Sequence, residues 1–157
     1  MEAQGLAGTR YPCGHHDWIL ARADVLVLCS TGAVPVSWRI VNGLVYLEST
    51  QGATFEEWRD AVDFALADPA YQVGMGILHD WRRLQTALPT AEVVRRSQYL
   101  AKSAARFGRT RWALVVDTSA AYGMGRMAEA LTGSGTGLRV FRDPAEAEAW
   151  ARGEPGR

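Results

Sequence analysis

The chain has 157 residues, of which 48% are hydrophobic and 22% charged, as in an ordinary globular domain that buries a sizeable core. Seventeen basic residues balance seventeen acidic ones, so no net charge favours nucleic acid or a strongly charged substrate. The two cysteines, Cys13 and Cys29, form no CxxC pair, and no apolar run approaches the roughly 18 residues that span a bilayer. We therefore expect a cytoplasmic protein with neither a disulfide framework nor a transmembrane segment.

Residues 1–34 have no sustained hydrophobic period and mix glycine, proline and adjacent histidines. We predict an irregular N-terminal extension here, which would lie upstream of the true start if translation begins at Val34. The run CGHHD (Cys13–Asp17) holds four residues of zinc-ligand type, but their spacing is too tight for one tetrahedral site and no second ligand pair follows. We expect no metal.

Regular patterning begins at Pro35. The runs SWRIV (37–41) and LVYLES (44–49) favour strands, and the Asn-Gly pair between them is the strongest short hairpin signal. Thr54 and Glu57 then form a capping box ahead of an apolar face with helical spacing, so a helix is predicted. Asp68-Pro69 ends that helix.

Three further strand–helix pairs are predicted after this first helix. VGMGIL (73–78) reads as a central strand, followed by a long helix from Pro89 to about Phe107. RWALVVD (111–117) predicts a fourth strand, and a helix over 120–131 follows it. GLRVF (137–141) predicts a fifth strand, and Asp143-Pro144 has the N-cap and first-turn proline that start a last helix.

The predicted order of elements is therefore ββαβαβαβα. Strands that alternate with helices call for a mostly parallel sheet with right-handed crossovers, here preceded by an antiparallel hairpin. We predict one α/β domain over residues 35–153, with a sheet of about five strands and helices packed on it, and a tail at 154–157.

The sequence HDWRR follows the third predicted strand, at the edge where ligands bind in open α/β sheets. Neighbouring residues of a strand point to opposite faces, so His79 and Asp80 do not pair with each other, and a nucleophile is missing unless Ser97 or Thr86 folds back. We expect no catalytic residue and no cofactor, and an enzyme using His79 and Asp80 is a third hypothesis. The residues predicted to form a strand end and a binding loop are His79, Asp80, Trp81, Arg82 and Arg83.

The run YGMGRMA, from Tyr122 to Ala128, has the form of a dinucleotide-binding motif. It lies inside a late helix, however, and not directly after a first strand. We interpret its two glycines as places where the helix packs closely on the sheet.

Charge is unevenly distributed along the chain. From Arg82 to Arg111 eight positive residues stand against Glu92 alone, whereas residues 48–68 hold six acids and Arg59. This asymmetry favours an anionic ligand, a phosphorylated protein partner or self-association, including a dimer. Basic residues are not interleaved with exposed aromatics, so a nucleic-acid partner is not expected.

The hairpin, the alternating order and the sequences RWALVVDTSAAYGMGRMAEAL and LRVFRDPAEAEAWARG resemble the SpoIIAA-like members of the STAS/SEC14-like proteins, over about residues 37–153. This resemblance implies a SpoIIAA-like fold and a non-catalytic, regulatory module for protein–protein interaction. In STAS domains a partner kinase phosphorylates a serine or threonine after the third strand. The usual Asp-Ser-Ser-Gly tetrad is absent here, and Thr90 and Thr86 are the candidate phosphoacceptors. Thr90 is also predicted to be the N-cap of the next helix.

The SEC14-like side of the resemblance implies an alternative, an apolar pocket that binds a small amphiphile or lipid. A contiguous apolar void would favour this alternative, whereas a solid core with an exposed loop would favour the interaction module. Packed core is the ordinary role of such large side chains. The candidate pocket residues are Trp58, Tyr99, Trp112 and Met124.

Overall fold

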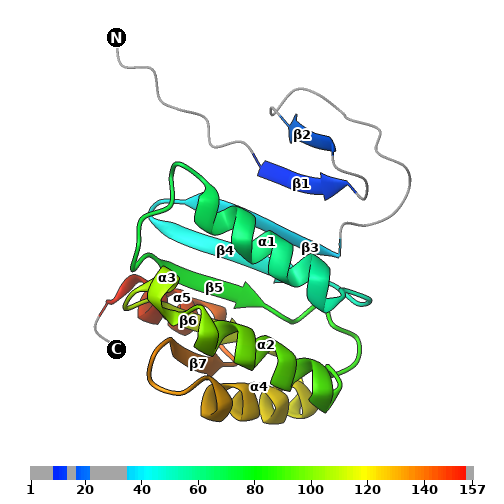
Figure 1. Cartoon of the computed structure of the whole chain (residues 1–157). Coiled ribbons are helices and arrows are strands. Elements are labelled where there is room, and N and C mark those ends of the chain that lie inside the picture. Colours follow the sequence, from blue (N-terminus) through cyan, green and yellow to red (C-terminus); the bar gives the residue numbers. More distant parts are fainter. Residues whose placement is uncertain (1–8, 14–16, 22–34, 155–157) are drawn as a thin grey trace.

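The computed structural model describes residues 9–13, 17–21 and 35–154, and the side chains of 35–154. Its centre is a seven-stranded sheet in the order β2-β1-β3-β4-β5-β6-β7 (Figure 1). The pairs β2–β1, β1–β3 and β3–β4 are antiparallel, and β4 to β7 are parallel neighbours. The strands are β1 (Thr9–Cys13), β2 (Asp17–Ala21), β3 (Val36–Val41), β4 (Leu44–Ser49), β5 (Gly76–Asp80), β6 (Arg111–Val115) and β7 (Gly137–Phe141).

The helices follow the strands as the alternating pattern predicts. They are α1 (Phe55–Ala67), α2 (Thr90–Lys102), α3 (Ala104–Phe107), α4 (Ser119–Thr132) and α5 (Pro144–Arg152). The predicted α/β class and the order ββαβαβαβα are confirmed by β3 to β7 and the helices between them, with the short α3 as an addition. None of the helices in the described ranges is long and apolar enough to cross a membrane.

Two strands lie in the segment that we predicted to be irregular. β1 pairs with β2 over five residues of each strand, and it meets β3 at Arg10 and Trp38. Without β1, the outer edge of β3 would leave backbone donors and acceptors unpaired, and β1 fills that place. The spacing of apolar residues along the chain does not reveal such pairing. The candidate zinc run at 13–17 spans the connection between β1 and β2, and its residues 14–16 lie outside the described residues.

Local signals in the sequence account for the hairpin and the first helix. Asn42 and Gly43 both have positive φ, 50° and 73°, which a type I′ turn requires. Thr54 caps α1, because its hydroxyl accepts from the Glu57 N–H while the Glu57 carboxylate accepts from the Thr54 N–H. This reciprocal capping box starts the helix where the sequence predicts it.

The long helix expected over 89–107 is divided in two. α2 ends at Lys102, and α3 begins after Ser103, which has φ −95° and ψ 6°. The division brings Phe107, which is fully buried, against the ring of Trp112 at a centroid distance of 5.6 Å. The N-cap prediction for Thr90 is wrong: Pro89 is the cap, and Thr90 is the first helical residue.

The helices cover the two faces of the sheet unequally (Figure 1). α1, α2 and α4 pack on one face, where the largest apolar cluster forms around Trp58, Leu100 and Trp112. α5 packs on the other face, with Ala147 and Ala151 against β5 and β6. The sheet is thus covered on both sides along β5 and β6, and every residue of these two strands except Asp80 and Arg111 is buried.

Two glycines let helices approach the sheet closely, and they only partly match our interpretation of YGMGRMA. In α4, a Cβ on the buried Gly125 would lie 2.9 Å from Val140 and 3.1 Å from Leu114, but one on the exposed Gly123 would meet nothing within 4 Å. Residues two apart on a helix differ by about 200°, so both cannot face the sheet. The second close approach is at Gly76, where a Cβ would lie 2.2 Å from the backbone oxygen of Ala151 in α5.

Candidate functional site

The carboxyl ends of the parallel strands bring charged residues together at one edge of the sheet. Arg82, just after β5, pairs with Asp80 through an Nη2–Oδ2 contact of 2.7 Å, and Arg83 pairs with Glu48 of β4 at 3.1 Å. The hydrogen bond to Asp80, and then the charges of Asp80, Asp117 and Glu48, raise the pKa of Arg82. The predicted binding loop therefore presents arginines set among carboxylates at the carboxyl ends of three neighbouring strands.

The loop that follows β5 is held by its own apolar residues. Trp81 and Leu84 are buried, and they pack with Leu114 and Val116 of β6 and its end. The Trp81 N–H donates to the carbonyl of Val115 at 2.9 Å, and the Leu84 N–H donates to the carbonyl of Trp81 at 2.9 Å. These contacts fix the backbone of the loop, so the exposed Arg82 and Arg83 extend from a defined base.

His79 belongs to the core and not to the exposed edge. Its Nε2 accepts a hydrogen bond from the indole N–H of Trp81 at 3.0 Å and lies 2.8 Å from the hydroxyl oxygen of Ser49. Because an indole nitrogen can only donate, Nε2 is an acceptor and the ring hydrogen is on Nδ1. Burial, and next the charge of Arg96, hold the pKa of His79 well below its usual value of 6.5. The ring is therefore neutral at physiological pH.

Ser49 is the residue that sequence reasoning missed, since only Ser97 and Thr86 were weighed as partners of His79. The parallel register of β4 and β5, which pairs Leu47 with His79, brings Ser49 beside the ring. Alternation along each strand is readable from the sequence, but this register is not. Ser49 is fully buried and shares Nε2 of His79 with the indole N–H of Trp81, so the contact gives no accessible nucleophile.

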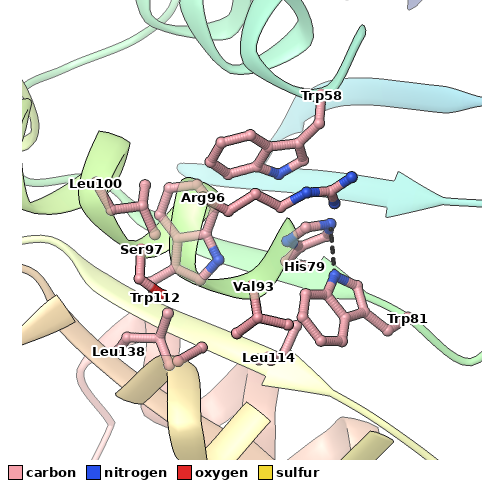
Figure 2. A pocket seen from close by; sticks show the side chains of 11 residues that line it. Trp58, His79, Trp81, Val93, Arg96, Ser97, Leu100, Trp112, Leu114 and Leu138 are labelled. Atoms are coloured by element: carbon pink, nitrogen blue, oxygen red, sulfur yellow. Dashed lines mark hydrogen bonds between the residues drawn. The ribbon is translucent and has the colours of Figure 1, made fainter. Parts of the chain in front are cut away.

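A small cavity lies beside His79, between α1, α2 and the sheet (Figure 2). Its volume is about 20 Å³, room for roughly one water molecule. It is lined by Trp58, His79, Trp81, Val93, Arg96, Ser97, Leu100, Trp112, Leu114, Ala128 and Leu138.

Two of the four residues predicted to line an apolar pocket do line this cavity. Trp58 and Trp112 meet there, with ring centroids 6.3 Å apart. Tyr99 packs edge-on against Trp58, and its hydroxyl donates to Asp63; burial and then this hydrogen bond raise the pKa of Tyr99 to about 12. Met124 is partly buried in the cluster under α4.

The two threonines predicted as phosphoacceptors are both exposed. The Thr86 N–H and hydroxyl donate to Oε1 of Gln51, at 3.1 Å and 3.3 Å. Thr90 lies at the amino end of α2, a helix of 13 residues. Both side chains are thus open to modification, and Thr90 occupies the position where helix N–H groups favour negative charge.

The uneven charge distribution is partly neutralised within the chain. Arg95 pairs with Glu56 at 2.7 Å, and Arg106 pairs with Asp63 at 2.6 Å, so that α2 and α3 supply cations to the acids of α1. Such exposed pairs contribute little to stability, about 0–1 kcal/mol each. Because these pairs neutralise Arg95 and Arg106, the basic surface is smaller than the sequence suggests. Arg82 and Arg83 lie apart from them, among acidic residues at the strand ends.

In the ranges that the structure covers, no group of three or more histidine, cysteine, aspartate or glutamate residues could hold a metal ion. Comparison of the chain with protein-family models, with curated proteins and with solved structures found no match in any of the three.

Proposed function

We propose that the chain is a non-catalytic module of SpoIIAA/STAS-like type that binds a protein partner through the loop after β5. The observation that carries the proposal is this loop itself, in which Trp81 and Leu84 are buried while Arg82 and Arg83 stay exposed. A loop whose backbone is fixed by packing presents its side chains to a partner at a low entropic cost.

The arginines suit recognition of carboxylate or phosphate groups. A guanidinium binds either group through two parallel hydrogen bonds, and arginine is enriched at protein interfaces for that reason. The present partners of Arg82 and Arg83, namely Asp80 and Glu48, are partly exposed, so these ion pairs can exchange for partner groups at little cost.

Phosphorylation of Thr90 or Thr86 is the regulatory form of the same proposal. Both residues lie on the connection between β5 and α2 or at its end, and both are exposed. A phosphate on Thr90 would add negative charge at a helix N-terminus, a favourable place, and would alter the charge that Arg82 and Arg83 present to a partner.

The amphiphile and enzyme alternatives find less support. A cavity of about 20 Å³ is far below the several hundred Å³ of typical small-molecule sites. His79 is 2% exposed and neutral, and its Nε2 is engaged by Trp81, so it offers no accessible base.

Affinity purification of the full chain from its own host, followed by native mass spectrometry, tests the proposal. We expect a protein partner with the wild type, and its loss in an Arg82→Glu/Arg83→Glu double variant. Arg126→Glu on α4 is the matched control, since Arg126 is similarly exposed and also sits in a surface ion pair. Equal recovery of the partner with the double variant, or a bound species of lipid mass, would contradict the proposal; the same spectra report phosphate and dimers.

A further inference from the structure

Asn42 is the only asparagine in the chain, and Gly43 follows it. An Asn-Gly pair can lose ammonia without an enzyme, because glycine has no side chain to hinder attack by its backbone nitrogen on the preceding side-chain amide. Here both residues are exposed, and a Cβ on Gly43 would meet nothing within 4 Å. The pair is therefore open to water and chemically capable of this reaction.

The reaction is a cyclisation followed by hydrolysis, and its only co-reactant is water. The Gly43 amide gives its proton to water, and its nitrogen attacks Cγ of Asn42. The N–Cγ bond forms, the Cγ–Nδ2 bond breaks, and Nδ2 takes a proton from water and leaves as ammonia. Water then opens the cyclic imide. Cleavage at Cγ gives aspartate, whereas cleavage at the main-chain carbon gives isoaspartate, whose backbone runs through Cβ and Cγ.

The turn between β3 and β4 keeps the two reacting atoms apart. Asn42 and Gly43 have φ 50° and 73°, and a type I′ turn sets ψ of its first central residue at about 30°. With that ψ, the Gly43 nitrogen and Cβ of Asn42 lie on opposite sides of the Cα–C bond, so Cγ is out of reach. Cyclisation requires rotation about this bond, which swings the carbonyl oxygen of Asn42 together with the Gly43 nitrogen.

The carbonyl that must swing is held by the last helix. Nη1 of Arg152 donates to the oxygen of Asn42 at 2.7 Å. The guanidinium is fixed in turn by Glu148, which accepts from Nε at 3.2 Å and from Nη2 at 2.8 Å, and by the hydroxyl of Tyr46, which accepts at 3.1 Å. Arg152 also lies in the last turn of α5, where a cation is favourable. Rotation at Asn42 therefore requires that the bond to Arg152 break first.

We propose that Asn42 is a deamidation site that the bond from Arg152 keeps closed, so that the reaction occurs when the carboxyl end of α5 leaves the turn. Isoaspartate adds an atom to the backbone of the two-residue turn, which then loses the geometry that pairs Val41 with Leu44. The change is irreversible and accumulates with the time that α5 spends undocked. The site lies away from the loop after β5 and is independent of the partner proposed above.

Incubation of the full chain at mildly alkaline pH, followed by intact-mass spectrometry, tests the proposal. Replacement of –NH2 by –OH changes the mass, and peptide mapping has one asparagine to confirm. We expect the folded chain to react more slowly than the same chain in urea. Arg152→Ala should react about three- to tenfold faster than the wild type, the factor that corresponds to the loss of one hydrogen bond.

Two variants serve as controls. Arg126→Ala removes a comparable ion pair on the surface of α4 and should keep the wild-type rate. Thr54→Ala lowers the stability of the domain without touching the turn, and it should also keep that rate because the reaction needs only local opening. Equal acceleration by Thr54→Ala and Arg152→Ala, or equal rates in the folded and unfolded chains, would overturn the proposal.

The sign of the Arg152→Ala effect separates two roles of the guanidinium. A bond that restrains rotation slows the reaction, so its removal raises the rate. A guanidinium that acted mainly by making the Gly43 N–H more acidic would speed the reaction, and its removal would lower the rate. An Arg152→Ala rate at or below that of the wild type would therefore also overturn the proposal.

Discussion

Two alanine substitutions in α4 test whether Gly125 is required by helix–sheet packing. In a helix interior alanine is more favourable than glycine by about 1 kcal/mol, and both Gly123 and Gly125 lie inside α4. Gly123 is exposed with open space around it, so Gly123→Ala should raise the free energy of unfolding by about this amount. For a domain of this size that gain corresponds to a Tm increase of about 2–4 °C.

Gly125→Ala gains the same helix preference but adds a methyl group at 2.9–3.1 Å from Val140 and Leu114. Both neighbours are buried, and valine has little freedom at χ1, so overpacking should cost about 1–3 kcal/mol. The two variants should therefore differ by about that amount in urea-induced unfolding monitored by circular dichroism. Equal stabilisation by both substitutions would refute the packing explanation.

Three further predictions concern single residues. The pKa of His79 lies well below 6.5 in the folded state, so below pH 6.5 the unfolded chain binds more protons than the folded chain. The free energy of unfolding should therefore fall on acidification below pH 6.5, by up to about 1.4 kcal/mol per pH unit. His79→Gln should remove this part of the pH dependence, as measured by urea titrations at pH 7.5 and 5.5. Gly76→Ala would place a methyl group 2.2 Å from the Ala151 oxygen, and since backbone cannot rotate away, calorimetry should show a loss of about 3 kcal/mol or more. Thr54→Ala should lose about 1 kcal/mol by the same measurement, and a loss near zero would show that Glu57 caps α1 unaided.

The parts of the fold that depend on local chemistry could be predicted from the sequence. The Asn-Gly turn, the Thr54 capping box and the Asp143-Pro144 start of α5 each act within a few residues, and the structure contains all three. The strands β1 and β2 could not be predicted, because short unpatterned runs become strands by pairing with one another and with the edge of β3.

The candidate site could likewise be predicted from the sequence only in part. Exposed arginines after a buried strand were predictable from charge and periodicity, and Arg82 and Arg83 lie where that pattern puts them. The contact of Ser49 with His79 depends on the register between two strands. This arrangement leaves no trace in the spacing of residues along the chain.

The contacts of α5 have a consequence for the order in which the domain assembles. Neighbours among β3 to β7 are consecutive in the chain, so the sheet can grow by one strand–helix unit at a time. One face, however, is covered by the last helix, whose Arg152 donates to the carbonyl of Asn42 at 2.7 Å across 110 residues. We expect docking of α5 to be the late, long-range step, and until it occurs the apolar side chains of β5 and β6 on that face stay open to water and to other chains.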